Sequence, residues 1–264
     1  MTFFRVSGLG IIGPGISNRA DLNEFLSRKH TGAMATTEIG TPEIINPRER
    51  RRTSPTVRLA LGAASQAVRE SECTPNDLPM VFASSLGDGS ILNELLEVLA
   101  DPARHVSPTR FHNSVHNSAL AYWSIGTQNR LAGTSLAAHD CTFGAAILKS
   151  IAQLLTEQRA LLLVVYDHPF PAPLDRARPL LAPFAAAFVL SPPELGNGIH
   201  VCLSLVSGSA SLPTPPQLEC LNELWKRNPA ARALPFVEAL VQGRRTHVDV
   251  MFQRERTLRL EVCP

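Results

Sequence analysis

Cys141 stands at a predicted transition from strand to helix, inside the segment SLAAHDCTFGAA. A short strand is expected over residues 135–138, and a helix that begins with small residues is expected over 142–158. The start of a helix carries partial positive charge, which favours a thiolate over a thiol. Sharp turns of this kind expose the nucleophile of acyl-transfer enzymes beside backbone N–H groups that bind an oxyanion. The pattern fits an acyl-carrying nucleophile, and it equally fits a small buried residue in a tight turn.

Three histidines are candidates for polar support of such chemistry. His139 and Asp140 directly precede Cys141, but neighbouring residues of a strand point to opposite faces, so we do not expect both to assist it. His112 and His116 lie in the segment FHNSVHN, at the i, i+4 spacing of a metal-binding pair. The segment lacks the glutamate of the HExxH motif and an obvious third ligand. We therefore expect loop hydrogen bonds or partner contacts from these two histidines, and no metal or cofactor.

Gly8, Gly10 and Gly13 form a GxGxxG pattern after the apolar start of the chain. In a dinucleotide-binding fold such glycines lead straight into a helix whose N-terminus meets the pyrophosphate. Here Pro14 follows at once, and no second strand ends in an acidic residue about 20 positions further on. The pattern is therefore more typical of a glycine-rich turn after the first strand.

Apolar runs alternate with helical patterns along the chain. Continuous apolar segments predict strands that are buried on both faces, and leucines or alanines at helical spacing predict the helices between them. Segment 200–207 alternates as an exposed or edge strand would, whereas 108–117 is expected to be irregular. This order predicts an α/β fold with a mainly parallel mixed sheet covered by helices. The other expected strands cover residues 3–12, 79–84, 135–138, 160–166 and 185–190, and a hairpin is expected over 248–262. A first short helix is expected after a cap at Ser17 or Asn18. The further expected helices cover residues 57–69, 90–99, 119–131, 142–158, 218–226 and 236–242.

Composition excludes several classes of function. The 264 residues carry a formal net charge of +2, with 44% hydrophobic, 18% charged and 6% aromatic residues. This balance is typical of a globular protein, and it offers neither the basic surface nor the stacking platform of a nucleic-acid binder. The one basic run, residues 48–52, is expected to be a solvated face or loop. The longest apolar stretch, residues 160–166, is too short to cross a bilayer, and the N-terminus does not resemble a signal peptide.

The cysteines indicate a compartment. Cys73, Cys141, Cys202, Cys220 and Cys263 are odd in number and show no CxxC spacing. Neither a disulfide framework nor a zinc site is therefore expected, and a reducing, cytoplasmic location is the expectation.

Several motifs occur in an order that resembles the N-terminal domain of the thiolase-like β-ketoacyl synthases. The opening VSGLGIIGPG resembles the first strand and turn of that family, and the alanine-rich RLALGAASQAV and the strand and turn VFASSLGDG follow in the family's order. The segments SPTRFHNSVHNS and AGTSLAAHDC then lead to DCTFG, which resembles the family's ACSSG. The resemblance covers about residues 3–192. It places Cys141 on the nucleophile position and Gly144 on the motif glycine, and it implies a turn or oxyanion role for Thr142 and Gly144.

The resemblance also implies that this chain lacks two catalytic histidines of the family. The family uses two further histidines, in HGTGT and NxFGFGGxN motifs, to decarboxylate the extender unit and to stabilise the enolate and oxyanion. None of the eight histidines of this chain precedes a glycine, and no GFGG occurs. We expect a truncated C-terminal half, with a ketosynthase-like domain over residues 1–195 and a short extension, 196–264, packed on the same domain. A cysteine without its base and oxyanion partner loses most of its catalytic advantage, so independent condensation is not expected.

The FHNSVHN segment makes the chain similar to short ketosynthase-like proteins of aryl-polyene and related pigment clusters. The resemblance implies a non-autonomous subunit of the chain-length-factor type, which supports a full β-ketoacyl synthase in fatty-acid or polyketide chain elongation. The implied assembly is a heterodimer, with acyl carrier protein bound through the partner. The alternative is a cysteine-dependent acyltransferase or β-ketoacyl synthase that carries its acyl group on Cys141.

Overall fold

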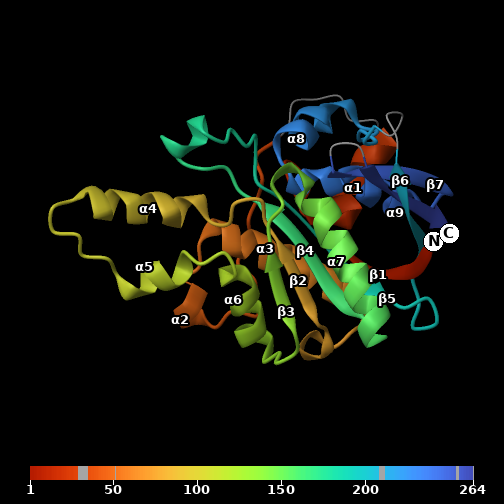
Figure 1. The fold of residues 1–264 in the computed structure, drawn as a ribbon, viewed down its shortest axis with the longest axis horizontal. Coiled ribbons are helices and arrows are strands. Elements are labelled where there is room, and N and C mark those ends of the chain that lie inside the picture. Colours follow the sequence, from red (N-terminus) through yellow and green to blue (C-terminus); the bar gives the residue numbers. More distant parts are fainter. Residues whose placement is uncertain (29–34, 51, 208–211, 254–255, 264) are drawn as a thin grey trace.

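One mixed sheet of eight strands runs through the part of the chain that the computed structural model describes, residues 1–28, 35–50, 52–207, 212–253 and 256–263 (Figure 1). The strand order across the sheet is β3-β2-β4-β5-β1-β6-β8-β7. The continuous apolar runs form the central strands β4 and β5, which are buried along their whole length. The strands are β1 (Thr2–Ile12), β2 (Met80–Ala83), β3 (Gly133–Leu136), β4 (Leu161–Asp167), β5 (Phe184–Ser191), β6 (Ile199–Ser207), β7 (Thr246–Gln253) and β8 (Arg256–Cys263).

The sheet is mixed, as the sequence predicts, but the expectation that it is mainly parallel is wrong. Only β2 pairs in parallel, with β3 on one side and β4 on the other. The remaining strand pairs of the sheet are antiparallel. The difference follows from the connections. Parallel neighbours need a crossover, and helices lie between β2, β3 and β4 in the chain, whereas β5 follows β4 without an α-helix between them.

Helices cover both faces of this sheet. On one face α3 (Pro55–Ser71) packs over β1, β4 and β5, and α6 (Ser118–Thr127) packs beside it against β2 and β3. On the other face α7 (Thr142–Glu157) and α9 (Leu234–Gln242) enclose the second apolar layer, together with the short 3-10 helix η5 (Ala230–Ala233), which contacts β4, β5 and both helices. The remaining helices are α1 (Arg19–Arg28), α2 (Pro47–Arg50), α4 (Gly89–Ala100), α5 (Pro108–Asn113) and α8 (Asn222–Arg227).

Helices α4 and α5 project from the body of the molecule as an arm (Figure 1). Asp88 caps the start of α4, because its side chain accepts a hydrogen bond from the backbone N–H of Ile91. The expectation of irregular structure over residues 108–117 is wrong for its first half, where Pro108 occupies the first turn of α5. None of the helices in the described ranges is long and apolar enough to cross a membrane.

The structure also tests the predicted helix cap at Ser17 or Asn18 and the predicted edge strand over residues 200–207. Asn18 caps α1, since its side-chain oxygen accepts from the backbone N–H groups of Ala20 and Asp21. The strand expected at an edge, β6, lies inside the sheet, because β8 pairs along its free side. The centre of the predicted terminal hairpin, residues 254–255, lies outside the described residues.

The glycines of the GxGxxG pattern allow close packing of a strand against a helix. Gly8 and Gly10 lie within β1, and a Cβ on either would stand 2.0 Å from a backbone carbonyl oxygen of α3, at Ala67 and Ala63 respectively. No helix starts among these glycines, because α1 begins at Arg19. Gly8 and Gly10 therefore let α3 approach the sheet. The turn that the sequence predicts follows β1, where Gly13 pairs with Ile16.

A side chain at Gly10 is expected to disrupt this packing. Gly10→Ala should lower the free energy of unfolding by about 3 kcal/mol, because the new methyl group overlaps a carbonyl of a buried helix. The matched control is Gly40→Ala, where a Cβ would meet no atom within 4 Å. Urea denaturation measures both. Equal stabilities for the two variants would contradict the packing role.

Candidate functional site

The turn that carries Cys141 is a 3-10 helix, η2 (His139–Cys141), which leads directly into α7. The Thr142 hydroxyl fastens this turn, since its Oγ1 accepts from the backbone N–H of Ala138 at 3.1 Å and donates to the carbonyl of His139 at 2.7 Å. The backbone N–H of Cys141 donates to Ala138 at 2.9 Å, and that of Thr142 donates to His139. Both N–H groups are thus engaged within the turn, so Thr142 has a turn role here and offers no free backbone donor to an oxyanion.

Gly144 lets the first turn of α7 lie against β7. A Cβ at this position would stand 2.2 Å from the carbonyl oxygen of Met251. The small residue therefore brings the Cys141 turn against the C-terminal strands of the chain, and the structure gives it a packing role.

The thiol of Cys141 is half-buried and has no hydrogen-bonding partner among the described residues. Burial raises the pKa of this thiol, the Asp140 carboxylate raises it further, and the Arg232 guanidinium acts in the opposite direction. The side chain of His139 is 66% exposed, its Nδ1 lies 3.3 Å from Asp140, and it forms no hydrogen bond with the Cys141 thiol in the described structure. In the isolated chain the expected species is therefore the protonated thiol.

Two arginines come to this turn from distant segments. Arg178, in the loop after β4, forms an ion pair with Asp140. Arg232, in η5, has its guanidinium carbon 4.4 Å from the ring centre of Trp225. The turn of Cys141 is therefore surrounded by charged groups of arginine and aspartate.

The other two predicted histidines have separate surroundings. The ring of His116 bridges two strands, with Nε2 2.9 Å from the carbonyl of Ser84 and Nδ1 2.9 Å from Oγ of Ser135. Because a carbonyl only accepts, Nε2 carries the proton and donates to Ser84. His112 is exposed and lines a cavity of about 500 Å³ with Tyr122. The structure does not direct these two rings to a common point, and neither is hydrogen-bonded to Cys141.

Asp167 connects the ends of two strands with η5. Its Oδ1 accepts from Oγ of Ser84 at 2.9 Å, and from the backbone N–H and Oγ of Ser85 at 2.8 and 2.9 Å. Its Oδ2 accepts from the backbone N–H of Ala230 at 3.1 Å. Burial raises the pKa of this carboxyl to about 6, although all four hydrogen bonds act to lower it. The network fixes η5, and with it Arg232, over the carboxyl end of β4.

Sequence reasoning missed Asp167, Arg178 and Arg232. A signal for Asp167 was present, because a single acidic residue ends the continuous apolar strand LLLVVYD. Polar groups at the carboxyl ends of parallel strands meet at one edge of a sheet, which is a common place for functional residues. The arginines lie in a proline-rich loop and a short 3-10 helix, and the sequence of neither segment indicates that its arginine lies near Cys141 in the fold.

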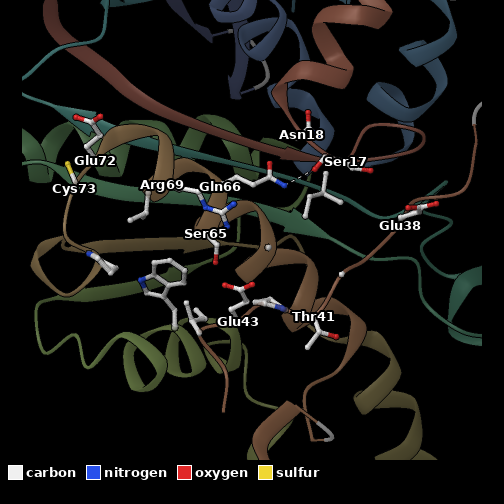
Figure 2. Close-up of a pocket in the computed structure, with 18 residues that line it drawn as sticks. Ser17, Asn18, Glu38, Thr41, Glu43, Ser65, Gln66, Arg69, Glu72 and Cys73 are labelled. Carbon is white, nitrogen blue, oxygen red and sulfur yellow. Dashed lines mark hydrogen bonds between the residues drawn. The ribbon is translucent and has the colours of Figure 1, made fainter. Parts of the chain in front are cut away.

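A separate cavity of about 790 Å³ lies on the face of the sheet that α3 covers (Figure 2). Gln66 of α3 spans part of its wall, donating from Nε2 to the carbonyl of Ser17 at 2.7 Å. Glu38, Glu43 and Arg69 also line it. Cys141 and the three predicted histidines are absent from its lining, so this cavity is distinct from the cysteine turn.

A comparison with models of known protein families shows the family to which this chain belongs. The family model described as "Beta-ketoacyl synthase, N-terminal domain" matches residues 27–254, which is most of the chain. The chain belongs to this family. No curated protein matches its sequence.

Solved structures show the same thiolase-like ketosynthase fold. The complex of the ketosynthase ApeO with its chain length factor ApeC from Xenorhabdus doucetiae is similar with a TM-score of 0.72 at 18% identity, over 99% of this chain and 100% of that chain. The ishigamide ketosynthase/chain length factor is similar with a TM-score of 0.73 at 11% identity, over 99% of both chains. A β-ketoacyl synthase from Burkholderia phymatum is similar with a TM-score of 0.61 at 14% identity, over 92% of this chain and 79% of that chain. At these identities the likeness establishes the fold.

The stability of the chain is expected to depend on pH through Asp167. Its pKa is raised from 3.8 to about 6, so between these pH values the folded protein holds a proton that the unfolded chain has released. The free energy of unfolding should therefore fall as the pH rises from about 4 to 6, by up to about 3 kcal/mol for this group. Asp167→Asn should remove this part of the slope.

Urea titrations at several pH values measure this slope. The control is Asp175→Asn, since Asp175 is exposed in the loop after β4. A slope that is the same in Asp167→Asn and in the unaltered chain would contradict the assignment.

Proposed function

We propose that the chain is a non-autonomous, ketosynthase-like subunit of the chain-length-factor type, which pairs with a full β-ketoacyl synthase in polyketide or fatty-acid chain elongation, as in aryl-polyene formation. One observation carries the proposal: the arm formed by α4 and α5 displays large apolar side chains that the chain itself does not cover. Such surfaces on a soluble domain mark contact with another protein.

The apolar residues of the arm follow helical spacing. Leu92, Leu96 and Leu99 lie at i, i+4 and i+7 on α4, with 42%, 46% and 51% of each residue exposed. Phe111 on α5 is 62% exposed, and Ile125 on α6 is 70% exposed. Leu95 lies beside them, three residues after Leu92 and four before Leu99, and is the buried leucine of this face. One side of the arm is therefore left without a partner in the described chain.

The edge of the sheet lies on the same side of the molecule as the arm (Figure 1). β3 is the outermost strand and pairs only with β2 in the described residues. His116, in the turn after α5, joins β3 to this region through Ser135. An unpaired strand edge beside exposed apolar helices supports docking of a partner of the same fold, because edge strands accept further strands.

The Cys141 turn supports the non-autonomous part of the proposal. The thiol has no base within hydrogen-bonding distance in the described residues, and its pKa is raised by burial. The solved complexes of a ketosynthase with its chain length factor provide the precedent for a pair in which one member assists the other. In such a pair the partner carries the condensation, and acyl carrier protein reaches the assembly through that partner.

A second candidate function follows from the position of Cys141 at the start of α7. The residue would take an acyl group by thioester exchange: the acyl carbon moves from the carrier sulfur to Sγ of Cys141, and the released carrier thiol takes the cysteine proton. A base for this step must then come from the partner.

A charge in the arm is expected to prevent pairing. Leu96→Glu should weaken association with a co-expressed full-length β-ketoacyl synthase by about 30-fold or more, because a carboxylate would be buried against apolar side chains. Leu195→Glu is the matched control, since Leu195 is 48% exposed in a loop away from the arm. Light scattering after size-exclusion chromatography measures the complexes.

Pairing of the unaltered chain and of Leu195→Glu, but not of Leu96→Glu, is the expected result. A chain that stays monomeric beside the synthase, or a Leu96→Glu variant that pairs normally, would refute the proposed surface.

The second candidate has its own test by mass spectrometry. After incubation with acyl carrier protein and the partner, it predicts an acyl adduct on the unaltered chain and on Cys73→Ser, and none on Cys141→Ser. Without the partner the adduct should be absent, because the thiol is protonated. An unmodified Cys141 under both conditions removes this candidate while leaving the pairing proposal intact.

A further inference from the structure

The turn that carries Cys141 has one positive charge in excess. Arg178 and Arg232 lie beside it, and Arg232 is near enough to interact electrostatically with Asp140, with Arg178 and with Cys141 when its thiol is ionised. Asp140 is the carboxylate partner of Arg178. Within the described residues Arg232 has no carboxylate partner of its own. Two guanidinium groups are therefore balanced by a single carboxylate.

Arg232 is held in place. Its guanidinium carbon lies 4.4 Å from the ring centre of Trp225, and its Nη2 donates to the carbonyl of Lys226 at 3.2 Å. The start of η5 is fixed by Asn228, whose Oδ1 accepts from the backbone N–H groups of Ala230 and Ala231 at 2.9 and 3.2 Å. A cation that is fixed by stacking and by a rigid backbone is already organised for a ligand.

Both guanidinium groups are also incompletely satisfied. The Nε atoms of Arg178 and Arg232 are buried, and neither has a hydrogen-bond acceptor in the described structure. Buried donors of charged groups are costly without partners, and two neighbouring cations repel each other. An anion between the two arginines would relieve both costs.

We infer that Arg178 and Arg232 form a binding site for an anionic group, a carboxylate or a phosphate carried by a small ligand, beside the thiol of Cys141. Planar guanidinium groups suit both anions, because their N–H groups match pairs of oxygen atoms. Asp140 competes for this site as an internal anion. The inference deepens the second candidate function, because it names the class of group that would lie next to Cys141, but its test requires neither acyl transfer nor a partner.

The ratio of two alkylation rates at Cys141 reports on this charge. Iodoacetate carries a carboxylate and iodoacetamide does not, and both alkylate a thiolate by displacing iodide. Dividing the first rate by the second cancels the effect of thiolate concentration. An uncompensated charge close enough to interact with the thiol should change the ratio by about tenfold. Peptide mass spectrometry separates Cys141 from Cys73, which serves as a reference within the same chain.

The variants should shift the ratio in opposite directions. Arg232→Gln should lower it about tenfold, whereas Arg232→Lys, which keeps the charge, should stay near the unaltered value. Asp140→Asn should raise it, because the competing carboxylate is removed. Arg244→Gln is the control for loss of an arginine elsewhere, since Arg244 is exposed in the turn before β7. Added phosphate or acetate should lower the rate with iodoacetate, and the stronger of the two identifies the preferred anion.

A ratio at Cys141 that equals that of Cys73, or that is unchanged by Arg232→Gln, would overturn the inference. If Cys141 reacts with neither reagent, the thermal unfolding temperature tests anion binding instead. Phosphate should then raise the unfolding temperature above that in chloride of equal ionic strength, and the Arg178→Gln/Arg232→Gln double variant should lose this effect. An equal unfolding temperature in both salts would also overturn it. None of these results depends on pairing with a synthase, so the two proposals can fail separately.

Discussion

The buried carboxylate of Asp167 is the interaction on which the arrangement of the site depends. Two serines at the end of β2 and a backbone N–H of η5 all donate to it, although burial raises its pKa to about 6. A polar group buried at this depth is tolerated because its oxygen atoms are fully used. The consequence is that the sheet edge, the segment around His116 and the C-terminal helices are held together at one end of the molecule, next to Cys141.

This arrangement fixes the Cys141 turn in place without providing a base for its thiol in the described residues. The turn is fastened by Thr142 and pressed against β7 at Gly144, so its backbone is well defined. Its charged neighbours are arginine and aspartate, and the thiol has no hydrogen-bonding partner in the described residues. Chemistry at this position would therefore depend on groups brought by a partner or a ligand, which agrees with a subunit that assists a synthase.

The sequence predicted most of the elements and the family, but it predicted only part of the site. Apolar runs identified β4 and β5, and helical spacing identified α3, α4 and α7, because these patterns depend on local burial. The sequence missed the antiparallel character of the sheet, since strand direction depends on connections and pairing. Cys141 was found because its motif is contiguous. Asp167, Arg178 and Arg232 were not, because they come to the turn from segments whose meeting is set by tertiary packing.

The central claim is that the arm and the free edge of β3 form the surface that contacts a synthase. Hydrogen–deuterium exchange of the chain, alone and mixed with a full-length β-ketoacyl synthase, tests it most directly. The account predicts slower exchange on α4, α5 and β3 in the mixture, with little change on β6, β7 and β8 at the opposite side of the sheet. Unchanged exchange throughout the arm, or protection confined to the C-terminal strands, would contradict it.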